Sequence, residues 1–198
     1  MNDGDLHTND FLDGFLECIK GLDLKNIEEM ISILISVRSG GGRIFFAGVG
    51  GGAGNANHAV CDFRKLAGFE CYSISDNVSE LTARVNDDGW DTSYSNWLKV
   101  SKFAAKDCLM VFSVGGGNKE LDVSTNLIGC LELAQRCGAK IVGVVGRDGG
   151  YAAKVADCCV VVPNPNPAFV TPYTESMQAL IWHLIVTHPE IMTGEMKW

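Results

Sequence analysis

An imidazole and a carboxylate four residues apart, His58 and Asp62, are the first pair in this sequence that could perform chemistry. In a helix this spacing places both side chains on one face, where they could transfer a proton or converge on one metal ion. They follow a glycine-rich segment, residues 48–54, which itself follows the apolar run 44–47. A strand, a glycine loop and a helix N-terminus in this order form an anion site, because the backbone can approach a ligand closely and free N–H groups point at it. The pattern predicts an anion site beside a His/Asp pair.

A second glycine loop, residues 113–118, ends another apolar run and precedes another helical stretch. In an open parallel sheet both loops would lie at the carboxyl edge of the strands, where ligands bind. We therefore expect a phosphate near residues 113–118 and the N-terminus of the helix that follows. The alternative is that each loop is only a tight turn between a strand and a helix.

Two further candidates, Glu175 and His183, lie in the last predicted helix. His183 stands in the apolar run 180–185, where a histidine without a role would need a hydrogen bond in the core. Each candidate also has an ordinary structural interpretation. His58 could be a helix-surface residue, Asp62 a solvated acid, and Glu175 a charge that favours a helix N-terminus.

The elements that must position these residues alternate along the chain. Apolar residues at helical spacing predict helices over residues 11–22 and 24–37, which form a leading helical segment, 10–38, after a loose tail, 1–9. The other expected elements are strands at 44–47, 71–75, 108–114, 140–146 and 158–162. Between them we expect a helix at 78–85, a following helix through Trp97 and Val100, a helix at 119–137 and a short turn near 151–155. Thr171 is expected to cap a last helix that has Pro172 at its first position and ends at His188. Alternation of this kind predicts an α/β fold with a doubly wound, flavodoxin-like parallel sheet of about five strands.

Composition limits the class of protein. A chain of 198 residues with 46% hydrophobic content fits a single domain over residues 1–198. The net charge of -8 argues against nucleic acid as the main partner. No apolar run is long enough for a transmembrane helix, and the acidic start lacks the layout of a signal peptide, so we expect a cytoplasmic protein without a membrane partner. The 8 cysteines form no CxxC pair, and we expect buried thiols.

A dinucleotide site is one alternative for the first loop. Gly48, Gly50 and Ala53 match the loose fingerprint for such sites, and Asp76 follows the second predicted strand, where an acid could bind a ribose. Two helices before the first strand, and no sequence for a separate catalytic domain, count against this alternative.

The chain resembles the sugar isomerase (SIS) fold and, within it, the phosphoheptose isomerases. The resemblance covers roughly residues 10–188 and rests on six segments: 48–52, 55–58, 85–87, 112–113, 146–150 and 175–183. Members of this family convert sedoheptulose 7-phosphate to D-glycero-D-manno-heptose 7-phosphate. The resemblance implies an aldose–ketose isomerase that acts on a phosphorylated sugar as a homo-oligomer, expected to be a tetramer.

The resemblance also implies a metal site. The family has a His-x-x-x-Glu helix and a later Gln-x-x-His-x-x-x-x-His helix, which supply zinc ligands. Here His58 and His183 keep the first and last ligands, whereas Asp62 replaces Glu, Glu175 replaces Gln and Gln178 replaces the middle His. The implied metal set is His58, Asp62, Glu175 and His183, with one Zn²⁺ or another divalent metal per subunit and with Asp62 as base and His183 as acid. Eight residues span about 12 Å of helix, so Glu175 must reach back or one ligand must come from another subunit.

The substrate-binding residues implied by the resemblance come from both glycine loops, from the two helices that carry His58 and His183, and from residues 86–87. They are Val49, Gly50, Gly51, Asp62, Asn86, Asp87, Ser113, Val114, Gly115, Asn118 and Glu175. The second loop departs from the family, which has Ser-Thr-Ser-Gly-Asn-Ser where this chain has Ser-Val-Gly-Gly-Gly-Asn. Val49 likewise stands where the family has an Asn near the sugar. The alternative function is a non-catalytic SIS protein that senses a sugar phosphate or binds a protein partner, and the presence of Asp62 and His183 favours the enzyme.

Overall fold

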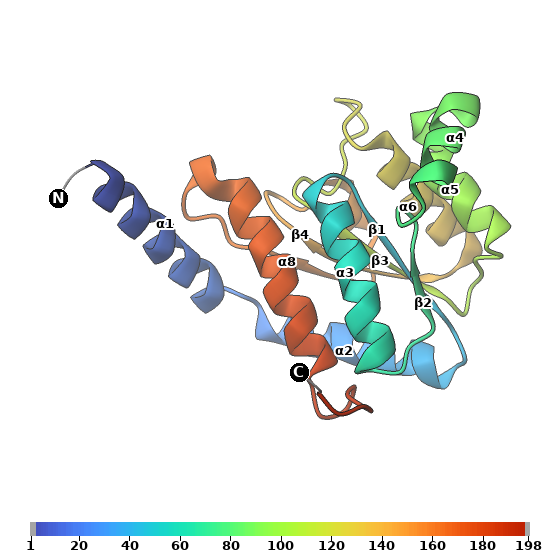
Figure 1. Ribbon diagram of the computed structural model, residues 1–198, viewed down its shortest axis with the longest axis horizontal. Helices are drawn as coiled ribbons and strands as arrows, with labels where there is room; N and C mark the ends of the chain where they lie inside the picture. Colours follow the sequence, from blue (N-terminus) through green and yellow to red (C-terminus); the bar gives the residue numbers. More distant parts are fainter. Residues whose placement is uncertain (1–2, 197–198) are drawn as a thin grey trace.

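The computed structural model describes residues 3–196, and within them five parallel strands form one sheet in the order β2-β1-β3-β4-β5. The strands are β1 (Ile44–Gly48), β2 (Cys71–Ser73), β3 (Cys108–Ser113), β4 (Lys140–Val145) and β5 (Cys158–Val161). Helices lie on both faces of this sheet (Figure 1). The predicted doubly wound α/β fold is confirmed, and the strand order is the flavodoxin-like one.

Within residues 3–196, helices precede the first strand, connect the strands and follow the last of them. They are α1 (Asp3–Lys20), α2 (Leu24–Ser39), α3 (Gly51–Lys65), α4 (Val78–Asp88), α5 (Trp90–Val100), α6 (Thr125–Cys137), α7 (Gly150–Val155), the 3₁₀ helix η1 (Pro167–Phe169) and α8 (Val170–Val186). No helix among the described residues has the length and apolar character to cross a bilayer.

Two apolar cores lie on opposite faces of the sheet, because neighbouring residues of a strand point in opposite directions. Phe46 packs in the core that α2, α3 and α8 cover, and Phe45 packs in the core that α5, α6 and α7 cover. Both side chains are fully buried. α3 and α8 pack side by side over the first face (Figure 1), and this pairing brings together residues more than a hundred positions apart.

The prediction of a loose tail over residues 1–9 is wrong for residues 3–9, which belong to α1. This helix projects from the body of the molecule (Figure 1). It is anchored by aromatic contacts, because the Phe11 ring lies 5.3 Å from the rings of both Phe169 and Tyr173. The Tyr173 hydroxyl also donates to the Phe11 carbonyl over 3.0 Å. Residues 1–2 lie outside the described residues.

The predicted helix over 119–137 begins only at Thr125. The Asn118 side-chain oxygen accepts the N–H groups of Glu120 and Leu121, which turns the chain, and Asn118 and Val123 exchange backbone hydrogen bonds. The last helix also differs from the prediction. It begins at Val170 after η1, with Phe169 rather than Thr171 at the N-cap, and it ends at Val186 rather than at His188.

Candidate functional site

Three of the predicted metal ligands meet on the outer face of α3 and α8. His58 and Asp62 lie one turn apart on α3, and His183 lies on α8. The Nε2 atoms of His183 and His58 lie 3.4 Å and 3.8 Å from Asp62 Oδ2. One ligand atom from each residue lies within 4.8 Å of the other two. This convergence is the one that the metal hypothesis requires.

The surroundings of these side chains fix their orientation. The indole Nε1 of Trp182 donates to Asp62 Oδ2 over 3.0 Å. His183 Nδ1 lies 2.8 Å from the Ala179 carbonyl, so this nitrogen carries the proton that is donated there, and Nε2 faces Asp62. Hydrogen bonds of this kind, made by the ring nitrogen that does not face the site, orient a histidine toward a metal or a reacting group.

Glu175, the fourth predicted ligand, does not join this group within one chain. It lies eight residues before His183, and its carboxylate packs against Gly51 in the first turn of α3. A Cβ atom at Gly51 would lie 2.3 Å from the carboxylate oxygens. The negative charge of Glu175 is favourable there, because free N–H groups and the positive end of the helix dipole meet at this point. The predicted anion site of the first glycine loop is therefore next to an internal carboxylate.

Gln178 is a structural residue. Its side chain is fully buried, Oε1 accepts the Asn55 amide over 2.8 Å, and Nε2 donates to the Val144 carbonyl over 3.2 Å. Asn55 also donates to the Glu175 carbonyl over 2.9 Å. These bonds hold the start of α3, the middle of α8 and the end of β4 in one arrangement, which fixes the position of Glu175.

The first glycine loop is also held from the other face of the sheet. The Tyr94 hydroxyl donates to the Gly48 carbonyl over 2.7 Å. Burial raises the pKa of Tyr94 to about 12, so this hydroxyl stays protonated over the physiological range. A Cβ atom at Gly48 would lie 2.3 Å from the backbone of Gly52, which explains why the loop needs glycine there.

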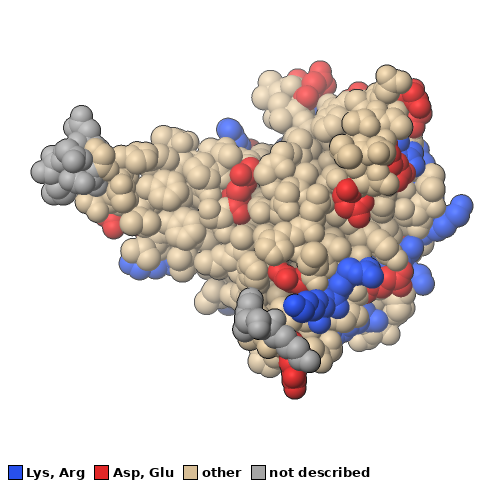
Figure 2. Space-filling model, viewed as in Figure 1, with Lys and Arg blue, Asp and Glu red and all other residues tan. Residues whose placement is uncertain are grey.

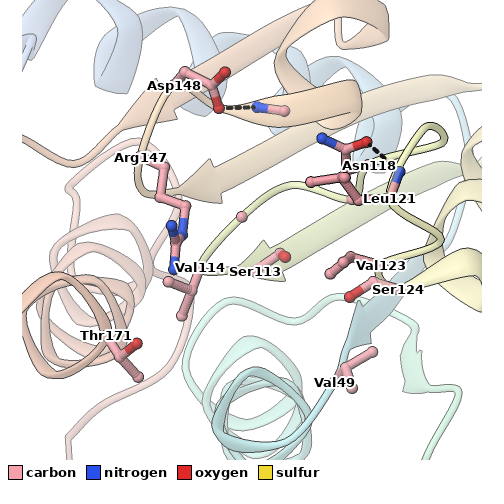
Figure 3. A pocket seen from close by; sticks show the side chains of 13 residues that line it. Val49, Ser113, Val114, Asn118, Leu121, Val123, Ser124, Arg147, Asp148 and Thr171 are labelled. Atoms are coloured by element: carbon pink, nitrogen blue, oxygen red, sulfur yellow. Dashed lines mark hydrogen bonds between the residues drawn. The ribbon is translucent and has the colours of Figure 1, made fainter.

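The second glycine loop opens on a cavity of about 650 Å³ at the carboxyl edge of β3 and β4 (Figure 3). Five predicted substrate-binding residues line it, namely Val49, Ser113, Val114, Gly115 and Asn118. Ser113 Oγ accepts the Gly116 N–H over 3.0 Å, which closes the loop on itself. The cavity lies where the parallel-sheet argument predicts a ligand.

Other predicted substrate-binding residues lie elsewhere. Asn86 and Asp87 are in the last turn of α4, a helix without buried residues, where Asn86 Nδ2 donates to Asp87 Oδ1 over 2.7 Å. Gly50 and Gly51 begin α3 and, like Asp62 and Glu175, are not among the cavity residues. A single chain therefore does not bring all the predicted residues into one pocket.

Sequence reasoning missed several residues of the cavity, among them Ser124, Arg147 and Thr171. Ser124 was assigned to the interior of a helix, and Thr171 to a helix cap. Arg147 is the second residue after β4, and residues just beyond the carboxyl end of a parallel strand lie at the ligand edge. This rule could have identified it from the sequence.

Comparisons with known proteins show relatives of this chain, although no protein-family profile matches the sequence. The chain is 32% identical over 167 residues to a phosphoheptose isomerase of Sulfurimonas denitrificans, covering 82% of this chain and 80% of that protein. It is also 32% identical over 167 residues to the lincomycin biosynthesis protein LmbN of Streptomyces lincolnensis, covering 79% of this chain but only 59% of that protein. The structure of phosphoheptose isomerase GmhA from Neisseria gonorrhoeae superposes with a TM-score of 0.78 at 23% identity, covering 92% of this chain and 94% of that chain.

The five-stranded sheet, the two glycine loops and the leading helices define a domain of the sugar isomerase (SIS) fold. The identity to the Sulfurimonas protein over most of both sequences identifies the family within that fold. The chain belongs to the phosphoheptose isomerase family.

Proposed function

We propose that this protein is an aldose–ketose isomerase that converts sedoheptulose 7-phosphate to D-glycero-D-manno-heptose 7-phosphate. Family membership supports the reaction class. The single observation that carries the proposal is the convergence of His58, Asp62 and His183 on the α3–α8 face. A carboxylate base beside an imidazole acid is the pair that enediol chemistry needs.

In the proposed reaction, Asp62 removes a proton from the carbon beside the substrate carbonyl, and His183 gives a proton to the carbonyl oxygen. The resulting enediol collapses to the isomeric sugar when Asp62 returns the proton to the former carbonyl carbon and His183 takes a proton back from the hydroxyl on the neighbouring carbon, so both groups end in their starting forms. Asp62 Oδ2 accepts the Trp182 N–H, so Oδ1 is the oxygen left to act as base. Because Nδ1 keeps its proton on the Ala179 carbonyl, His183 acts as the acid in its imidazolium form and gives up the proton on Nε2, which faces Asp62.

We propose Zn²⁺ or another divalent ion as a cofactor, one per subunit, held by His58, Asp62 and His183. Two imidazoles and a carboxylate are a common catalytic zinc set, which fits the donors present here. A bound ion would polarise the substrate carbonyl. Its ligand atoms include those that we assign to proton transfer, so metal analysis must accompany the assays.

We also propose a homo-oligomer, a tetramer, in which a second subunit covers the site. In one chain the side chains of His58 and His183 are 60% and 52% exposed. This is more exposure than expected for enediol chemistry, which benefits from the exclusion of water. On the face of the molecule that carries α3 and α8, Figure 2 shows only scattered charged side chains. On α1, Leu12, Leu16 and Ile19 form an exposed apolar stripe.

The eight cysteines are all free, which supports the reducing cytoplasm as the compartment.

The proposal is tested by following aldose formation from sedoheptulose 7-phosphate, with zinc supplied. The wild-type protein should convert sedoheptulose 7-phosphate to the aldose, whereas kcat of Asp62→Asn and of His183→Ala should be lower by at least about 100-fold. His188→Ala is a matched control, because His188 lies beyond α8 and faces Glu28. A wild type no faster than the two variants would remove the enzyme assignment. If it still bound the sugar phosphate, it would favour the sensor alternative.

A further inference from the structure

We propose that Arg147 is the cationic ligand of the substrate phosphate, an inference that rests on the proposed sugar-phosphate function. Arg147 is the one cation among the described residues that line the cavity. Its side chain extends toward Val114 (Figure 3), and a Cβ atom added at Gly115 would lie 3.8 Å from its Cδ and 4.0 Å from its Nε. The guanidinium therefore lies over the second glycine loop, where a phosphate is expected.

The guanidinium of Arg147 has no partner among residues 3–196. Other arginines do, since Arg43 pairs with Asp107 and Arg84 with Glu80. The carboxylate of Asp148 also lines the cavity, but it accepts the Gly150 N–H over 3.1 Å, points away from Arg147 (Figure 3) and forms no ion pair with it. A positive charge in a cavity, without an internal counterion, is available to an anionic ligand.

The second glycine loop, which lies beneath Arg147, has no charged side chain that could balance a bound phosphate. Between Ser113 and Asn118 the side chains are those of Val114 and three glycines, so the loop itself offers only backbone donors. The N–H groups of Gly115 and Gly117 have no acceptor among the described residues. A sugar phosphate carries a charge of about -1.5 to -2 at pH 7, and neutral donors alone do not balance it. The chain has a formal net charge of -8, so the background field also disfavours an anion.

The position of Arg147 is fixed by the backbone around it. A Cβ atom at Gly116 would lie 1.9 Å from the Gly149 carbonyl oxygen, which shows how closely the loop and the turn before α7 pack. The N–H groups of Tyr151 and Ala152 donate to the carbonyls of Gly117 and Gly116, each over 2.9 Å. Arg147 lies between β4 and this contact.

The backbone of Arg147 is itself in an uncommon conformation, with a φ of 52°. A positive φ is rare outside glycine and is kept where the surrounding structure fixes it, often at ligand sites. The side chain of this residue lines the cavity. A guanidinium fork offers two parallel N–H donors to a phosphate, which a single ammonium cannot do.

The test compares wild type, Arg147→Gln and Arg147→Lys by calorimetric titration with inorganic phosphate, together with KM and kcat for sedoheptulose 7-phosphate. We expect Arg147→Gln to weaken phosphate binding and raise KM by about 10- to 100-fold, and Arg147→Lys to have an intermediate effect. Arg136→Gln is the matched control, because Arg136 is exposed on α6 and outside the cavity. Circular dichroism and the melting temperature establish that each variant is folded.

The outcomes separate this inference from the proposed function. Phosphate binding that depends on Arg147, in a protein without isomerase activity, would support the inference and remove the function. An active wild type whose phosphate affinity and KM are the same in Arg147→Gln would overturn the inference and keep the function. Equal losses in Arg147→Gln and Arg136→Gln would also overturn it, since they would show a general effect of charge. So would phosphate binding too weak to detect together with an unchanged KM.

Discussion

Trp182 donates its indole N–H to the same oxygen of Asp62 that faces His58 and His183, over 3.0 Å. Trp182 is 1% exposed and packs against Phe112 of β3, so the orientation of Asp62 is tied to the core of the sheet. The carboxylate is held in place by a buried neighbour that needs no charge of its own.

The first prediction concerns this contact. Trp182→Phe keeps an aromatic ring but removes the donor, and a hydrogen bond to a charged group contributes about 1.5–3 kcal/mol. We expect kcat to fall about 10-fold or more with a smaller change in KM, because the base is no longer oriented. Trp97→Phe is the control, since Trp97 packs on Phe45 away from the site. Equal kinetic effects of the two substitutions would contradict a positioning role for Trp182.

The second prediction concerns the close contact of the glycine loop with the turn before α7. Gly116 and Gly138 have φ values of 68° and 69°, but only Gly116 has backbone within 4 Å of an added Cβ atom. Gly138→Ala should lower the free energy of unfolding by about 1–2 kcal/mol from the strained φ alone. Gly116→Ala should lower the free energy of unfolding by clearly more, because the Gly149 carbonyl must also move. Denaturant unfolding measures both, and equal losses would show that the contact relaxes freely.

A third prediction follows from the buried ion pair of Arg43 and Asp107. Asp107 is fully buried and accepts from the Arg43 guanidinium over 2.8 Å and from the N–H groups of Arg43 and Ala104 over 3.0 Å each. Burial alone raises the pKa of Asp107, but the bonds from Arg43 and Ala104 outweigh it and hold the pKa below its ordinary value. Asp107→Asn should lower the free energy of unfolding by about 3–5 kcal/mol at neutral pH.

The sign of the pH dependence follows from that lowered pKa. The carboxylate of Asp107 stabilises the folded state fully above its unfolded pKa of about 4, and this contribution is lost as pH falls through the lower folded value. The stability difference between wild type and Asp107→Asn should therefore stay constant between about pH 7 and 5 and shrink below about pH 4. A difference that grows on acidification would contradict the assignment.

Much of this fold could be predicted from the sequence, and the reason lies in particular elements. The run that contains Phe45 and Phe46, followed by glycines, could only be a buried strand that turns into a helix. The loop at residues 118–124 could not be predicted, because its helical apolar spacing is overridden by the Asn118 side chain, which binds two N–H groups and turns the chain.

The site was only partly predictable for a similar reason. The pairing of His58 with Asp62 follows from helical spacing, but the approach of His183 depends on the packing of α3 against α8. The span of about 12 Å between Glu175 and His183 on one helix already indicated a difficulty for a shared site. No spacing rule, however, shows that the Glu175 carboxylate would instead meet Gly51. Long-range packing decides both positions.

The fourth prediction tests the proposed assembly. Leu12, Leu16 and Ile19 are 54%, 51% and 38% exposed on one face of α1. Leu16→Glu should shift the protein from the proposed tetramer to smaller species in light scattering after gel filtration. Val100→Glu, at an apolar position on α5 that is 66% exposed, should leave the mass unchanged. A tetramer that persists in Leu16→Glu would place the interface elsewhere.

The central claim is that Asp62 moves a proton between two carbons of a sugar phosphate. The direct measurement is NMR of sedoheptulose 7-phosphate incubated in D₂O with wild type or with Asp62→Asn, each with zinc supplied and its metal content determined. The account predicts that wild type forms aldose with deuterium at carbon 2, because a proton held on Asp62 exchanges with solvent during the enediol step, and that Asp62→Asn forms none. Aldose formation at the wild-type rate by Asp62→Asn would contradict the account.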